Sequence, residues 1–141
     1  ILAQSTAPAP LHDDIIAKGR NAVETLARAL ELFGLLALET FITIDGKLLF
    51  NEIAPRPHNS FHWTIEGCAT SQFTQLARLL TGMPFGATHT YGNWQMNNLL
   101  GEDMTSLPEI LITPGIHVHL YGKTEAKLGR KMGHTNRLLN T

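Results

Sequence analysis

The chain has 141 residues, of which 43% are hydrophobic, and it carries a formal net charge of −1 at pH 7. This length and composition predict one sizeable core, and the near-neutral charge argues against a dedicated nucleic-acid-binding protein. The sequence contains no run of 18 apolar residues and no charged-then-apolar leader, so we expect neither a membrane span nor export. The single cysteine, Cys68, excludes an intramolecular disulfide and fits a reducing compartment, so we expect a cytoplasmic protein.

The first elements along the chain are a linker and a helix. ILAQSTAPAP begins without Met and runs into a Pro-Ala stretch, which we interpret as part of a longer protein. A helix is predicted over residues 11–34, where Asp13 or Asp14 can cap the start and Gly34 can supply the left-handed residue at the end. One buried face is expected from apolar residues at helical spacing, namely Ile16, Val23, Leu26, Leu30 and Phe33.

Two strands, residues 35–44 and 47–53, flank Asp45-Gly46, which is a strong β-hairpin signal. A two-residue loop would fix the register and place Glu39 directly opposite Glu52. The same register pairs Thr43 with Leu48 and Phe41 with Phe50. Two ionised carboxylates ~5 Å apart repel by roughly 3 kcal/mol at an effective dielectric constant of about 20. This cost predicts one of three compensations: a divalent cation, a protonated carboxyl, or exposure to water.

The loop after the hairpin favours the cation. Residues 54–60 contain two prolines and cannot continue a central strand, yet they supply Arg56, His58 and Asn59 within seven residues of Glu52. Hard oxygen ligands select Mg²⁺ or Mn²⁺, and Mg²⁺ held by one or two carboxylates usually completes its shell with water and phosphate oxygens. The pattern therefore indicates nucleotide-phosphate chemistry.

The second half of the chain is predicted to contain one helix, two strands and a basic segment. The helix covers residues 64–82 despite Gly67, and the strands cover residues 94–101 and 116–122. His117, His119 and Tyr121 share one face of the second strand, either as exposed surface or as the rim of a pocket. Residues 123–136 are turn-rich, and five of the eleven Lys and Arg lie in the last 19 residues, either solvated or forming an anion site.

Paired acidic residues on neighbouring antiparallel strands, followed by an arginine-bearing loop, resemble the metal site of ATP-grasp ligases. More narrowly, the chain resembles the C-terminal part of the 5-(carboxyamino)imidazole ribonucleotide synthase family, also called the ATPase subunit of phosphoribosylaminoimidazole carboxylase (PurK). Three motifs carry this resemblance: NEIAPRPHNS at 51–60, HWTIEGCATSQF at 62–73 and YGKTEAKLGRKMGH at 121–134. It implies an α+β fold, with the C-terminal part of an ATP-grasp domain (an antiparallel sheet flanked by helices) over 1–84 and a small β-rich C-terminal domain over 85–141.

The resemblance also implies a ligase that uses ATP, bicarbonate and aminoimidazole ribonucleotide in de novo purine synthesis. In this family ATP phosphorylates bicarbonate, and the ribonucleotide amine captures the carboxyphosphate or the CO₂ released from it. Glu39 and Glu52 match the ligands of Mg²⁺, with Mn²⁺ as an alternative, and Asn51 and Glu52 match the nucleotide contact.

Further site residues follow from the same motifs. Arg56 and His58 match catalytic residues that also touch the substrate, and the planar fork of an arginine suits carboxyphosphate. Asn59 matches a substrate contact. Lys123 and Arg130 match the two residues that hold the ribonucleotide phosphate.

The sequence departs from the family pattern at one position, and two alternative functions stay open. Phe61 stands where the family usually has glycine, and a positive φ at this position would strain it. The formate-dependent glycinamide ribonucleotide transformylase, another ATP-grasp ligase, shares the Pro-Arg-Pro-His loop. A non-catalytic dimerisation domain is the alternative from a different class. We expect a homodimer, a missing N-terminal part of the same enzyme, and no turnover by residues 1–141 alone.

Overall fold

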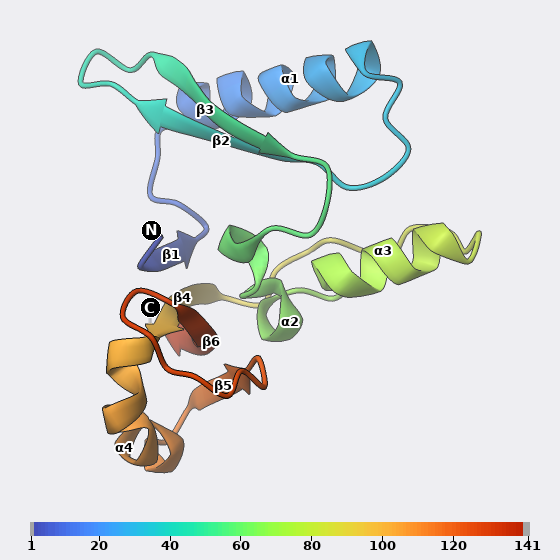
Figure 1. Cartoon of the computed structure of the whole chain (residues 1–141). Coiled ribbons are helices and arrows are strands. Elements are labelled where there is room, and N and C mark those ends of the chain that lie inside the picture. Colours follow the sequence, from blue (N-terminus) through green and yellow to red (C-terminus); the bar gives the residue numbers. More distant parts are fainter. Residues whose placement is uncertain (1, 140–141) are drawn as a thin grey trace. The chain divides into compact units, whose positions relative to one another are not determined.

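The computed structural model describes residues 2–139, which fall into two compact units (Figure 1). The first, here called the hairpin unit, comprises residues 9–59 and 72–86, and the second, the sheet unit, comprises residues 2–8, 60–71 and 87–139. Helices and antiparallel sheets are mixed in the chain, which confirms the α+β prediction. The predicted domain boundary between residues 84 and 85 stays a prediction. Within residues 2–139, no helix has both the length and the apolar content needed to cross a bilayer.

Helix α1 (Asp13–Ala29) lies along the hairpin of its own unit (Figure 1). Its end is a Schellman motif: the Leu32 N–H donates to the Ala27 carbonyl, and the Glu31 N–H donates to the Arg28 carbonyl. Glu31, with φ of 49°, therefore supplies the left-handed residue, and the prediction that Gly34 does so is wrong.

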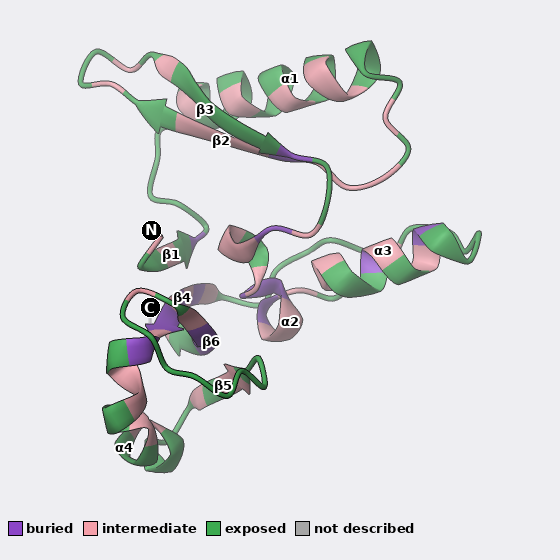
Figure 2. Ribbon diagram, in the orientation of Figure 1, coloured by how far each residue is buried: buried purple, intermediate pink, exposed green. Residues whose placement is uncertain are grey.

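The face that α1 turns toward the hairpin also differs from the prediction. Ile15, Gly19 and Val23 are half-buried, whereas Ile16 and Phe33 are exposed, and α1 contains no fully buried residue (Figure 2). Gly19 faces Leu48 of the hairpin, whose Cδ1 would lie 3.9 Å from a Cβ at position 19. The helix therefore packs through small and β-branched side chains at four-residue spacing.

Strands β2 (Ala37–Ile42) and β3 (Leu48–Ala54) form the predicted hairpin, with Glu39 opposite Glu52 as expected. The register near the turn is different, because Phe41 pairs with Leu49 rather than Phe50, and the Thr43 N–H bonds to the Lys47 carbonyl at 2.9 Å. The turn is thus one residue longer than predicted, closed by Gly46 at φ of 74°.

A β-bulge corrects the shift that the longer turn introduces. Glu39 pairs with Glu52 while the next residue, Thr40, pairs with Phe50, so Asn51 is an extra residue in β3. A bulge places two residues of one strand against one residue of the other. The two carboxylates meet because the longer turn and the bulge compensate for each other.

The segment predicted as one helix over 64–82 forms two short helices, α2 (Thr64–Gly67) and α3 (Gln72–Leu80). Cys68 is extended and pairs with Thr90 in an isolated bridge, which interrupts the helix. Gly67 packs tightly, since a Cβ there would lie 2.7 Å from Trp63 and 2.8 Å from Trp94. Tertiary pairing therefore overrides the helical periodicity.

The sheet unit contains four antiparallel strands in the order β1-β4-β6-β5. Strands β4 (Asn93–Leu100) and β5 (Ile116–Leu120) were predicted, whereas β1 (Gln4–Ala7) and β6 (Lys131–Leu139) lie in segments read as linker and turns. A 3₁₀ segment, η2 (Gly101–Ser106), and helix α4 (Leu107–Ile112) connect β4 to β5. The core of the sheet unit is formed by Ala7, Trp63, Trp94 and Met96.

Candidate metal and phosphate site

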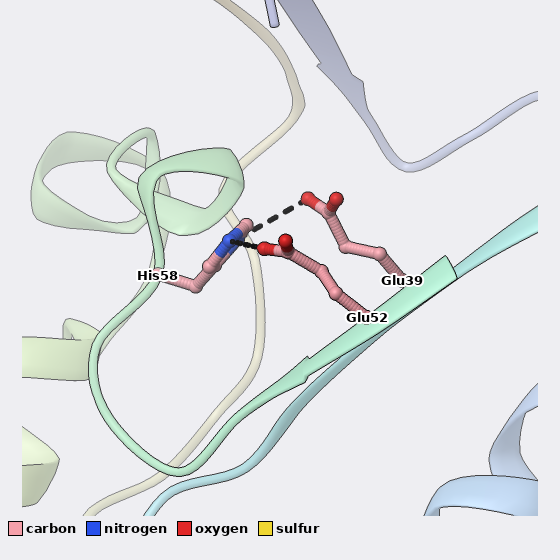
Figure 3. Close-up of side chains that lie close together, drawn as sticks. All are labelled: Glu39, Glu52 and His58. Carbon is pink, nitrogen blue, oxygen red and sulfur yellow. Dashed lines mark hydrogen bonds and ion pairs between the residues drawn. The ribbon is translucent and has the colours of Figure 1, made fainter. Parts of the chain in front are cut away.

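The hairpin unit gathers two carboxylates and an imidazole at one point. His58 Nδ1 lies 3.3 Å from Glu39 Oε1, and His58 Nε2 lies 3.1 Å from Glu52 Oε1 (Figure 3). The His58 side chain is 9% exposed, the Glu39 side chain 30% and the Glu52 side chain 54%. A neutral imidazole has one N–H and can donate to one carboxylate, whereas an imidazolium can donate to both. The repulsion between the two glutamates is therefore offset in part by an imidazole placed between them.

The β-bulge adds Asn51 to this group. Asn51 Nδ2 donates a hydrogen bond to Glu39 Oε2 at 3.2 Å, so Asn51 and Glu52 both reach the side of the hairpin on which Glu39 lies. Consecutive residues of a regular strand point to opposite faces. The extra residue in β3 is what brings these neighbours onto one side, as bulges next to active sites often do.

His58 is fixed by a residue that the sequence analysis did not single out. The side-chain amide of Gln72, the first residue of α3, accepts from the His58 N–H at 2.8 Å and donates to the His58 carbonyl at 2.9 Å. Both backbone groups of His58 are thereby paired as they would be in a strand. Gln72 lies within the motif at residues 62–73, but that motif does not indicate this role, because the role depends on where α3 begins and on no charge or spacing pattern.

This group of side chains fits a divalent cation. Glu39, Glu52 and His58 each offer one ligand atom, and these atoms all lie within 4.8 Å of one another. Two carboxylates and oxygen atoms from water or phosphate suit Mg²⁺, and an imidazole nitrogen beside them also suits Mn²⁺. The donor set can therefore hold a cation between the strands and leave positions open to a phosphate.

The other predicted residues of this loop lie next in sequence. Arg56 is exposed and donates from Nη1 to the Pro57 carbonyl at 3.0 Å. Asn59 is half-buried at the start of the 3₁₀ turn η1 (Asn59–Phe61). Phe61 ends this turn with an ordinary φ, because Glu31 is the one non-glycine residue with positive φ in the part of the chain that is described. The expected strain at Phe61 is therefore not found.

Lys123 and Arg130 both lie in the loop that joins β5 to β6 in the sheet unit. Both are exposed: Lys123 Nζ donates to the Lys131 carbonyl, and Arg130 Nη1 donates to the Glu125 carbonyl at 3.2 Å. Each cation is thus held by a backbone oxygen. Both side chains carry more N–H donors than this one bond uses, so further donors can bind an anion. The structure places the two cations in one loop.

That loop is anchored to η2. Glu102 Oε2 accepts a hydrogen bond from the Gly129 N–H at 2.8 Å, which lowers the pKa of this carboxyl. A Cβ at Gly101 would lie 2.0 Å from the Lys127 carbonyl oxygen, so only glycine permits this approach. Two consecutive residues of η2 therefore set the backbone immediately before Arg130.

Comparison with known proteins gives two family matches. The model of the ATP-grasp domain matches residues 1–73, and the model of the phosphoribosylaminoimidazole carboxylase C-terminal domain matches residues 95–141. The N5-carboxyaminoimidazole ribonucleotide synthase of Brucella melitensis biotype 1 is 47% identical over 138 residues, which cover 98% of this chain and 38% of that protein. The chain therefore spans less than two fifths of the length of this relative.

Solved structures agree along the whole chain. The ADP complex of an N5-carboxyaminoimidazole ribonucleotide synthetase superposes with a TM-score of 0.94 at 44% identity, covering 100% of this chain and 38% of the other. The synthase of Aspergillus clavatus, in complex with ADP and 5-aminoimidazole ribonucleotide, superposes with a TM-score of 0.91 at 34% identity. This superposition covers 100% of this chain and 40% of the Aspergillus chain. The family resemblance drawn from the sequence motifs is confirmed.

Proposed function

This chain belongs to the ATP-grasp family, and we propose from that premise that it is part of an N5-carboxyaminoimidazole ribonucleotide synthase. The observation that carries the proposal is the group of Glu39, Asn51, Glu52 and His58 on one side of a hairpin within the matched ATP-grasp region. The relative from Brucella melitensis, which carries that name, matches over 98% of the chain, and this supports the assignment to this branch of the family.

The proposed reaction has two steps. A bicarbonate oxygen attacks the γ-phosphorus of ATP, ADP leaves, and carboxyphosphate forms. The amine nitrogen of aminoimidazole ribonucleotide then attacks the carboxyl carbon, or CO₂ derived from it, and inorganic phosphate leaves. Phosphoryl transfer of this kind gains most from positioning and from neutralised charge on the transferred group.

The hairpin residues take the nucleotide side of this reaction. Glu39 and Glu52 would hold the cation, with the Asn51 amide next to the nucleotide phosphates. A bound Mg²⁺ or Mn²⁺ supplies positive charge to the phosphate oxygens. Arg56 can grip a carboxylate or phosphate with two N–H groups, which suits carboxyphosphate. His58, whose backbone is fixed by Gln72, can orient Glu39 and Glu52 and can hold a proton at either ring nitrogen.

Substrate contacts are proposed at the loop after the hairpin and in the sheet unit. Asn59 would contact the substrate together with Arg56 and His58. Lys123 and Arg130 would hold the ribonucleotide phosphate, since two cations in one loop can share a dianion. The hydrogen bond from the Gly129 N–H to Glu102 and the close approach at Gly101 support this role, because they fix the loop that presents Arg130.

The proposed protein is longer than this chain and works in the cytoplasm as a homodimer. Its N-terminal part would supply the remaining contacts to ATP and the ribonucleotide, because the chain covers 38% of a curated relative. The first test is phosphate release by the complete protein with ATP, bicarbonate and aminoimidazole ribonucleotide. Consumption of glycinamide ribonucleotide and formate instead would replace the proposal by the transformylase alternative, and phosphate release by residues 1–141 alone would contradict the need for the N-terminal part.

The cation site has its own test. Glu39→Gln and Glu52→Gln should each weaken Mn²⁺ binding by the complete protein, measured by the paramagnetic signal of free Mn²⁺. Glu24→Gln is the control, because Glu24 is an exposed α1 carboxylate paired with Arg28 at 3.4 Å. Equal Mn²⁺ affinity in all three variants would exclude the site and favour a non-catalytic domain.

A further inference from the structure

Tyr121 connects Lys123 to a group of histidines in the sheet unit, of which His134 is buried and the other two are half-buried. This group, here called the histidine cluster, consists of His62, His119 and His134. The Tyr121 hydroxyl lies 2.9 Å from His134 Nδ1, and the Lys123 ammonium lies 5.6 Å from the centroid of the Tyr121 ring. The second distance is within the range of a cation–π contact.

The histidine cluster is rigidly packed. His119 on β5 is paired with His134 on β6, and their rings stack at 4.6 Å with 13° between the planes. The centroid of the His62 ring lies 4.8 Å from that of His134. His134 is 2% exposed, so its ring has almost no freedom to move.

Polar contacts also hold the other two histidines of the cluster. His119 Nε2 lies 2.7 Å from Glu66 Oε1, and the buried Asn136 donates from Nδ2 to Glu66 and to the His62 carbonyl. Glu66 belongs to α2 and Asn136 to β6, so a helix and a strand both contribute hydrogen bonds to the cluster. The histidine that contacts Tyr121 is therefore packed against the rings of two histidines that are themselves held by polar contacts.

His134 is kept neutral in this environment. Burial, followed by the charges of His62 and His119, lowers its pKa to about 3. Its other ring nitrogen, Nε2, is buried without a hydrogen-bond partner in the described part of the chain. A buried polar atom without a partner costs stability. Packing alone therefore does not account for a histidine at this position.

We propose that His134 is a positioning residue: its hydrogen bond to the Tyr121 hydroxyl holds the Tyr121 ring in place, and the ring sets the position of Lys123. The inference rests on the proposed function, in which Lys123 binds the ribonucleotide phosphate. Gly122, at φ of 66°, turns the backbone between the two residues so that the lysine can fold back over the ring and donate to the Lys131 carbonyl. Removing the Tyr121 hydroxyl breaks the hydrogen bond to His134 but keeps the aromatic ring beside the Lys123 ammonium.

The test is Tyr121→Phe in the complete protein, with steady-state phosphate release measured against each substrate in turn. Loss of one hydrogen bond of ordinary strength should raise the KM for aminoimidazole ribonucleotide roughly 3- to 10-fold. The KM for ATP should not change. Tyr91→Phe is the matched control, because Tyr91 is the other tyrosine of the chain and its hydroxyl also contacts a histidine, His89, at 3.0 Å.

A double mutant separates this inference from the proposed function on which it rests. If Lys123→Ala raises the ribonucleotide KM and Tyr121→Phe adds nothing on that background, the link through the ring is supported. If Lys123→Ala raises the KM but Tyr121→Phe alone does not, the positioning role is wrong while the proposed function stands. If Lys123→Ala leaves the KM unchanged, the role of Lys123 in the proposed function fails, and the inference fails with it. Equal changes in the KM values for ATP and ribonucleotide would also overturn it.

Discussion

Replacing His134 with glutamine should remove a large part of the acid sensitivity of the sheet unit. Burial, followed by the charges of His62 and His119, lowers the pKa of His134 to about 3 in the folded chain. In the unfolded chain a histidine has a pKa of about 6.5. The unfolded state therefore takes up this proton first as the pH falls.

The sign and size of the effect follow from that difference. Because the folded-state pKa is the lower one, stability is fully present above about pH 6.5 and is lost as the pH falls toward about 3. Between pH 7 and pH 5, His134 alone should lower the free energy of unfolding by about 2 kcal/mol. The His134→Gln variant has no such proton to bind and should lose about 2 kcal/mol less than the wild type over that range.

Urea unfolding followed by tryptophan fluorescence measures this directly. The chain has two tryptophans, and both Trp63 and Trp94 are buried in the core of the sheet unit, so the signal reports this unit. His117→Gln is the control for replacing a histidine of the same sheet, since His117 is exposed on β5. If His134→Gln loses as much stability as the wild type between pH 7 and pH 5, with equal m-values, the reasoning is refuted.

Three further substitutions test packing and the candidate site. Gly133→Ala should lower the free energy of unfolding by about 1–3 kcal/mol or more in the tryptophan assay, because a Cβ would lie 2.3 Å from the His119 carbonyl oxygen. Gly19→Ala should raise the free energy of unfolding by about 0.5–1 kcal/mol, since its Cβ meets only ordinary contacts. Thermal unfolding of α1 followed by far-ultraviolet circular dichroism measures this change. Gln72→Leu should weaken Mn²⁺ binding several-fold, because both backbone groups of His58 lose their partner.

A neighbouring glutamine of α3 is the control for the last of these. The Gln75 amide donates to the Gly86 carbonyl at 2.7 Å and accepts from the Gly86 N–H at 3.0 Å, which is the same pair of bonds made to a different loop. Gln75→Leu should leave Mn²⁺ affinity as it is. Equal losses in both variants would mean that Gln72 acts on general stability and not on His58.

The hairpin illustrates what sequence can and cannot predict. Asp45-Gly46 correctly locates the turn, and the pairing of Glu39 with Glu52 is confirmed, but through a longer turn and a bulge that cancel. Hydrophobic alternation contains no sign of the bulge, because Asn51 can occupy a strand or a bulge equally well. The predicted pairing of Phe41 with Phe50, and of Thr43 with Leu48, was wrong because the turn is one residue longer than a two-residue loop.

The sheet unit was harder to predict, because β6, one of its two inner strands, is buried on both sides along much of its length while being polar. In β6 the consecutive residues Met132–Asn136 are all buried, so neither alternation nor an apolar run marks the strand. Gly133 is read as a turn signal from sequence, yet it is required by close contact with β5. Lys123 and Arg130 lie in one loop, and their shared role at the ribonucleotide phosphate stays a prediction. The contacts of Tyr121 and Gln72 depend on tertiary packing that no local pattern records.

The bulge in β3 also limits how this arrangement could be transplanted. A designer who copied Glu39, Asn51 and Glu52 onto an ideal hairpin would obtain one acid on each strand and an amide on the reverse side. The inserted residue would have to be copied with the side chains, and so would the three-residue turn that offsets it. In this hairpin the irregular backbone is as much a part of the donor set as the oxygen atoms are.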